Sequence, residues 1–207
     1  MKIKNHLIIP LLFISIGFSQ RPERNEIISE RHSNGLKKLV NVFEGTGLNE
    51  TLVGKYGFYD DGVKSFIEVY SNNKKHGKSI SWNKEGSVIV EGNYENGRMN
   101  GLWKWYYEYG QGQVKVQGSY VNGTKQHHQY RASEKGRKGL WTWYYENGQK
   151  REEATYKDGA LNGLLKKFHE DGRTNEEIKY QRNIEIYKYS YDYYEDGKIK
   201  SKATYKN

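Results

Sequence analysis

Few residues of this chain have the types and spacing that catalysis requires. The sequence contains no cysteine, and none of its glycines opens a helix after an expected strand, so neither a thiol nucleophile nor a phosphate-binding helix terminus is indicated. The acidic pairs Asp60-Asp61 and Glu152-Glu153 fall at expected turn and strand positions. His127 and His128 are neighbours on an extended segment, where successive side chains point in opposite directions. We therefore predict no enzymatic activity, no cofactor and no bound metal.

The residues best suited to recognition are aromatic rings that alternate along two expected strands. They are Trp103, Trp105 and Tyr107, and Trp141, Trp143 and Tyr145. Alternation places each set on one face of its strand. Corresponding positions in another repeat hold Ser79 and Ser81, so folding alone does not require tryptophan there. We hypothesise that the six rings form an exposed binding patch, and the alternative that they only cover the neighbouring inserted loop stays open.

The elements that position these rings are tandem repeats. Gly77 and Gly101 start two units that are 24 residues apart, and Gly139 and Gly163 start another such pair. A second glycine follows each start by nine residues, and an aromatic residue stands four residues before the second glycine. These aromatic residues, with their equivalents in the outer units, are Phe58, Trp82, Tyr106, Tyr144, Phe168 and Tyr193. A fixed period is the signature of a repeat architecture, and we predict that these six rings form a structural ladder.

Each unit has the pattern of a β-hairpin. A run of strand formers from Gly139 ends at Asn147-Gly148, a dipeptide that favours a type I′ turn. Further turn signals such as Asn96-Gly97 then lead into the next unit. The prediction is an all-β fold, an elongated single-layer antiparallel meander of tandem β-hairpin repeats over residues 53–207, with an inserted loop at 124–137. Residues 20–52 fit the pattern poorly and are expected to be an atypical N-terminal region or capping unit.

One motif resembles a known family. The pattern Tyr-x-x-Gly-x-x-x-Gly occurs at residues 94–101, followed by Leu102-Trp103, and again from Tyr156 to Leu164. It resembles the bacterial variant of the MORN repeat, which includes a subfamily labelled as antitoxin components of toxin–antitoxin systems. The resemblance runs from about Val53 to the end of the chain. It implies extended single-layer sheets used for protein contacts, with lipid binding also proposed.

The first residues have the features of a signal peptide. A basic start with Lys2 and Lys4 precedes an apolar run from Leu7 to Phe18, which is shorter than the roughly 20 residues that span a bilayer. We predict a signal peptide over residues 1–19, cleaved near Ser19, and a periplasmic or secreted mature protein. An uncleaved anchor is the alternative, and export argues against a cytosolic antitoxin role.

Composition and charge narrow the partners. Only 35% of residues are apolar but 14% are aromatic, which indicates a thin, ring-rich sheet instead of a large aliphatic core. The net charge of +9 favours anionic partners, but no nucleic-acid-reading module is present. The predicted function is a non-catalytic protein-interaction scaffold in the cell envelope. A carbohydrate-binding or cell-wall-binding module and an antitoxin-like binding protein are the alternatives, with an anionic lipid surface and homo-oligomers through sheet edges as further partners.

Overall fold

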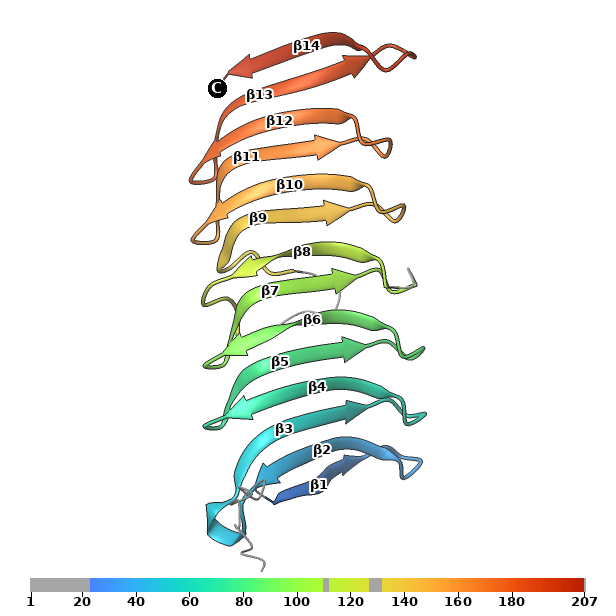
Figure 1. Ribbon diagram of the computed structural model, residues 1–207, viewed down its shortest axis with the longest axis vertical. Coiled ribbons are helices and arrows are strands. Elements are labelled where there is room, and N and C mark those ends of the chain that lie inside the picture. The colour runs from blue at the N-terminus through green and yellow to red at the C-terminus, as the bar shows by residue number, and fades with distance from the viewer. Residues whose placement is uncertain (1–22, 110–111, 127–131, 207) are drawn as a thin grey trace, which may run out of the picture.

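The computed structural model describes residues 23–109, 112–126 and 132–206, which form one sheet of 14 antiparallel strands. The strands lie side by side in chain order, so each pairs with the strand before it and the strand after it. Figure 1 shows a tall single layer with β1 at one end and β14 at the other. The predicted all-β meander of hairpin repeats is confirmed.

Seven successive hairpins make up the sheet, with strands of seven to ten residues. The strands are β1 (Arg24–Arg31), β2 (Lys37–Glu44), β3 (Thr51–Phe58), β4 (Lys64–Ser71), β5 (Lys74–Trp82), β6 (Val88–Glu95), β7 (Arg98–Tyr106), β8 (Val114–Tyr120), β9 (Arg137–Tyr144), β10 (Lys150–Lys157), β11 (Ala160–Phe168), β12 (Thr174–Gln181), β13 (Ile184–Tyr193) and β14 (Ile199–Lys206). A short 3-10 turn, η1 (Gly47–Asn49), connects β2 to β3. The poorly fitting region 20–52 thus supplies the end hairpin of the same sheet, and its capping role stays a prediction.

The turns inside the units differ from the predicted type I′ turn. At Asn147-Gly148 the N–H of Gly148 donates to the carbonyl of Tyr145 at 3.0 Å, and Gly148 but not Asn147 has a positive φ. This loop is a type I turn followed by a left-handed glycine, the usual three-residue hairpin loop. The Asn147 side chain accepts a hydrogen bond from the N–H of Gln149 at 2.9 Å, and the Asp61 side chain accepts the same bond from Val63 at 2.9 Å, which explains the preference for Asn or Asp at this position.

Type I′ turns occur instead between units. Asn96 and Gly97 have φ values of 49° and 80°, and Asp158 and Gly159 have values of 54° and 85°. The N–H of Gly97 also donates to the carbonyl of Lys75, at the start of β5, at 2.8 Å. Between-unit turns such as these therefore bond to the start of the first strand of the preceding unit, along the left edge of the sheet in Figure 1, while the turns inside the units lie along the right edge.

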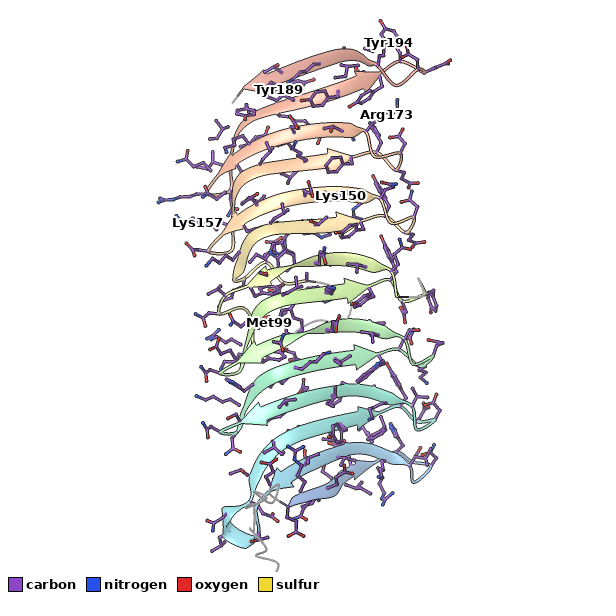
Figure 2. All side chains as sticks on the ribbon, in the orientation of Figure 1. Met99, Lys150, Lys157, Arg173, Tyr189 and Tyr194 are labelled. Carbon is purple, nitrogen blue, oxygen red and sulfur yellow. The ribbon has the colours of Figure 1, made fainter. Side chains whose placement is uncertain are left out.

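The two faces of the sheet carry different side chains. We call the face that bears Trp103 and Trp105 of β7 the tryptophan face, and the opposite face, which bears Tyr106, the back face. The register extends rows of side chains across the strands, so that Trp105 pairs with Val116 and Val116 pairs with Trp143. The buried core cluster includes Val90, Tyr94, Met99, Trp103, Trp105, Val116, Tyr120, Trp141, Ala154, Tyr156, Leu165 and Ile178. In Figure 2, Met99 lies near the middle of the sheet's length, where this cluster is centred.

The inserted loop leaves the sheet between β8 and β9, and its two ends meet at a narrow neck. The N–H of Val121 donates to the carbonyl of Gly136 at 2.9 Å. Arg137, which the sequence analysis assigned to the loop, is instead the first residue of β9 and pairs with Tyr120. The boundary was wrong because the strands begin before the unit glycine, as β7 does at Arg98.

Two sequence predictions fall on other parts of the chain. The signal peptide at 1–19 and the pair His127 and His128 lie outside the described residues. In the ranges that the structure does describe, no helix has the length and apolar character needed to cross a membrane.

Candidate functional site

Three of the six predicted binding residues are buried. Trp103 and Trp141 are 0% exposed, and Trp105 is 1% exposed. The prediction of an exposed patch is wrong for these three rings, because solvent and a partner protein do not reach them. The other three predicted residues are half-buried.

Glycines on the neighbouring strands make room for the buried indoles. A Cβ atom at Gly92 would lie 2.1 Å from the Trp103 ring, so this ring lies directly over the glycine backbone. Trp141 lies over Gly118 with the same spacing. The Trp103 indole N–H donates to the carbonyl of Asn93 at 3.0 Å, which satisfies the one polar group of the buried side chain.

The buried rings form a continuous stack across the middle of the sheet. Ring centroids are 5.2 Å apart for Tyr94 and Trp103, 5.8 Å for Trp103 and Trp105, and 6.1 Å for Trp105 and Trp141. Tyr120 meets Trp141 edge to face at 4.9 Å. The stack joins β7 to β9 past the inserted loop, so these rings act as the core of a sheet that has no second layer among the described residues.

Tyr107 and Tyr145 connect successive units instead of presenting free rings. The Tyr107 hydroxyl donates to the backbone carbonyl of Tyr144 at 2.7 Å. The Tyr145 hydroxyl donates to the carbonyl of Phe168 at 2.8 Å. Each bond joins the residue that follows the first strand of one hairpin to the last residue of the first strand in the next unit.

The six aromatic residues of the predicted ladder are all half-buried. They are Phe58, Trp82, Tyr106, Tyr144, Phe168 and Tyr193. The Tyr106 hydroxyl donates to Glu91 at 2.6 Å, and the Tyr144 hydroxyl accepts from Gln117 at 2.8 Å. Burial, with the nearby Glu91 carboxylate, raises the pKa of Tyr106, so its hydroxyl stays a donor at neutral pH.

An open groove of about 810 Å³ lies where the inserted loop returns to the sheet. We call it the Arg137 groove. Its lining residues are Lys115, Val116, Ala132, Ser133, Glu134, Lys135, Arg137, Trp143, Arg151, Glu152 and Tyr156. Four of these carry positive charge and two carry negative charge, so the groove favours an anionic ligand. Trp143 is the one predicted binding residue that lines it.

Arg137 is a buried cation in the wall of this groove. Its side chain is held among three rings, with the guanidinium carbon 4.6 Å from the Trp141 centroid, 5.2 Å from Trp143 and 4.9 Å from Tyr156. The residue is only 5% exposed. Desolvated cation–π contacts contribute up to about 2 kcal/mol, which helps to offset the cost of burying the charge.

The guanidinium also donates three hydrogen bonds. Nε donates to the carbonyl of Ser133 at 3.0 Å, Nη1 to the Tyr156 hydroxyl at 2.7 Å, and Nη2 to the carbonyl of Ala132 at 3.1 Å. The Tyr120 hydroxyl also forms a side-chain hydrogen bond with Arg137, so at most one of the five N–H donors lacks an acceptor among the described residues. Burial raises the pKa of Tyr156, so its hydroxyl is neutral where it meets Arg137.

The corresponding position two units earlier shows what Arg137 lacks. Lys75 stands two residues before Gly77, as Arg137 stands two before Gly139, and its ammonium lies 5.0 Å from the Tyr94 ring centroid. Lys75 has its own anion, the Glu68 carboxylate at 2.5 Å. No carboxylate of the described residues forms an ion pair with Arg137.

Glu152 is the acidic residue of β10 in the groove. Burial raises its pKa, although Lys167, Arg151 and Arg137 act in the opposite direction. The Glu152 carboxylate, like the Arg137 guanidinium, forms no ion pair with a described residue. A ligand that carries both signs of charge therefore finds a partner for each in the Arg137 groove.

A second open groove, of about 640 Å³, lies near the far end of the sheet between the turns that follow β11 and β13. It is lined by acidic residues such as Glu170 and Asp192 together with Arg173, which lies at the right edge of the sheet in Figure 2. The described residues contain no group of three or more His, Asp or Glu side chains placed to hold a metal.

Sequence reasoning missed Arg137 because it treated the residue as loop. The useful signal was its place two residues before the unit glycine, where other units have Met99 and Leu161. Both lie in strands, and Met99 is buried while Leu161 is half-buried. A basic residue at a position that is apolar in these two units, and that is otherwise basic at Lys75 with its own carboxylate partner, indicates a specific role.

The fold and its grooves define an open β-hairpin repeat protein, in which each repeat adds two strands to one sheet and leaves shallow surfaces for binding. Residues 75–96, 137–158 and 189–207 match the model of the MORN repeat variant, so these three segments are similar to repeats of this family. The resemblance found in the sequence is thus confirmed.

The other comparisons add little on function. A search of curated proteins gave no match. The chain is similar to a solved protein of unknown function from Bacteroides fragilis NCTC 9343, at 7% identity, with 89% of this chain and 93% of that chain covered and a TM-score of 0.16. A similarity at this TM-score supports no further argument.

Proposed function

We propose that this chain is a non-catalytic scaffold that binds a partner protein through the Arg137 groove. MORN repeats are generally associated with binding or scaffold roles. The observation that carries the proposal is the surplus of positive charge in an open groove. The buried core cluster and the hydrogen bonds between units join the strands of this sheet into one framework. Such a groove attracts acidic surfaces and holds them on a fixed framework.

We also propose that the protein acts in the periplasm or outside the cell. Residues 1–19 combine a basic start with a short apolar run and small residues at Gly17 and Ser19, which supports a cleaved signal peptide. N-terminal sequencing of the exported protein should give Gln20 as the first residue. A retained Met1 in a cytosolic fraction would contradict the proposal.

The carbohydrate alternative loses its main support. It depended on sugar faces stacking on exposed rings, and Trp103, Trp105 and Trp141 are buried. A protein partner remains the better match for a groove lined by both basic and acidic side chains.

Affinity purification from native envelope, with chemical crosslinking and mass spectrometry, tests the scaffold role. The informative variant combines Lys135→Glu and Arg151→Glu, because both residues line the groove and are exposed. The matched control combines Lys138→Glu and Lys179→Glu, which make the same change of charge at exposed positions outside the groove. We expect one recurrent partner that the groove variant loses and the control keeps.

Two outcomes would overturn the proposal. Equal recovery of the partner by both variants would place the interface elsewhere. Recovery of glycan or lipid without a protein partner would assign the chain to a different class of binding module.

A further inference from the structure

We propose that Arg137 binds a carboxylate of an acidic segment in the partner protein. The proposal rests on the scaffold function and names the chemistry of the same groove. It goes beyond a general attraction between charges, because it assigns recognition to one buried guanidinium.

The first argument is that Arg137 is a buried cation that forms no ion pair with a described residue, although its charge acts on Glu152 across the groove. Buried charges in proteins are normally paired, and Lys75, at the equivalent repeat position, is paired with Glu68 at 2.5 Å. Neutral carbonyls, a phenol and three rings surround Arg137 instead. A ligand carboxylate would supply the counter-charge that the chain itself provides for Lys75.

The second argument is that the guanidinium is fixed in place in the wall of an open groove. Three hydrogen bonds and the contacts with Trp141, Trp143 and Tyr156 hold its plane. A carboxylate that enters the groove therefore meets a cation whose position is already set, and a hydrogen bond between guanidinium and carboxylate is stronger than one between neutral groups. Because the group is already ordered, binding costs little side-chain entropy.

The third argument concerns the choice of a carboxylate over a phosphate. Glu134 and Glu152 line the same groove, and both repel a doubly charged phosphate more than a singly charged carboxylate. The exposed basic residues Lys135 and Arg151 provide further contacts along the groove for neighbouring acidic side chains of an extended segment.

Calorimetric titration of the full chain with a hexaglutamate peptide tests the proposal. The main variant is Arg137→Met, because Met99 occupies the equivalent repeat position and shows that the sheet accepts methionine there. Lys75→Met is the matched control, since it removes the cation that already has an internal partner. We expect Arg137→Met to weaken peptide binding by at least about tenfold and Lys75→Met to leave it unchanged.

A second measurement covers the case in which Arg137→Met does not fold. The Nε–H signal of Arg137 in the labelled wild-type protein should shift on titration with hexaglutamate, and Arg137→Lys should bind the peptide more weakly because a flexible ammonium lacks the planar geometry by which the rings hold the guanidinium. Inorganic phosphate and phosphatidylglycerol vesicles serve as competing probes.

The outcomes separate this inference from the scaffold function. Unchanged hexaglutamate binding by folded Arg137→Met, or tighter binding of phosphate or vesicles than of the peptide, would overturn it. If a partner from the envelope is lost with the Lys135 and Arg151 substitutions but bound fully by Arg137→Met, the scaffold role stands and the carboxylate role fails. If hexaglutamate binding depends on Arg137 but no protein partner is recovered, the ligand chemistry stands and the scaffold role fails.

Discussion

The hydroxyl of Tyr107 donates a 2.7 Å hydrogen bond to the backbone carbonyl oxygen of Tyr144, across the point where the inserted loop separates two units. The same link occurs where no insertion intervenes, from Tyr59 to the carbonyl of Trp82 at 2.7 Å and from Tyr145 to Phe168 at 2.8 Å. The insertion therefore leaves the contact between units unchanged. A repeat array whose stability depends on contacts between neighbours gains cooperativity from such links.

Removing one of these hydroxyls should weaken the sheet measurably. Tyr107→Phe keeps the ring but loses the bond to Tyr144, and we expect the free energy of unfolding to fall by about 1 kcal/mol. Tyr145→Phe should give a similar loss. Urea unfolding followed by circular dichroism measures both, with Tyr109→Phe as the control because Tyr109 is 84% exposed. Equal effects of Tyr107→Phe and Tyr109→Phe would show that the link contributes nothing.

The glycines beneath the indoles should not accept a methyl group. In Gly118→Ala the new Cβ would lie 2.1 Å from the Trp141 ring, and we expect a loss of about 1–3 kcal/mol from overpacking. Gly54→Ala is the matched control, because its Cβ would meet neighbours at an ordinary 3.6 Å. Thermal unfolding of the two variants compares them directly, and an equally stable Gly118→Ala would argue against the packing of Trp141 over this glycine.

Trp105 should be essential for folding, contrary to its predicted role in binding. The sequence alone predicted that this position tolerates serine, because Ser81 occupies it in another unit. Trp105 is 1% exposed and lies in the ring stack, so Trp105→Ser should cost about 3–5 kcal/mol. Near-ultraviolet circular dichroism and urea unfolding measure the loss. A stable variant with a native spectrum would restore the interpretation of this ring as a binding residue.

Glu152→Gln should stabilise the protein at neutral pH. Burial raises the pKa of Glu152 above its ordinary value of 4.5, so the folded state holds this proton more tightly than the unfolded chain does. The charged carboxylate therefore costs stability at pH 7, and the cost disappears as the pH falls through the raised pKa to below the ordinary value.

Urea unfolding of Glu152→Gln at pH 7 and at about pH 3.5 measures this effect, and the gain over the wild type should be present only at pH 7. Glu153→Gln is the control, because Glu153 is paired with Lys150 at 2.6 Å and should show no gain. The same gain at both pH values would mean that burial of the charge is not its cause.

Much of the fold could be predicted because its signals are local. Asp61-Gly62 and the aromatic Phe58 four residues before Gly62 lie within one hairpin, and the same spacing in each unit specifies a similar hairpin. The turn type at Asn147-Gly148 could not be predicted as easily. Asn-Gly fits both a two-residue and a three-residue loop, and the register of the strands on either side decides between them.

The candidate site was harder to predict because burial depends on neighbouring strands. Alternation correctly placed Trp103 and Trp105 on one face, but that face is the core. Whether an indole is buried depends on the residue opposite, and Gly92 becomes the neighbour of Trp103 only after β6 and β7 are paired.

The sequence by itself determined the repeat, the hairpins, their order and the choice of aromatic positions, because turn chemistry and alternation act over a few residues. Only the tertiary structure decided which face is buried and that Arg137 lies among Trp141, Trp143 and Tyr156. These contacts join side chains across adjacent strands, and strand register, which sets them, is a property of the assembled sheet.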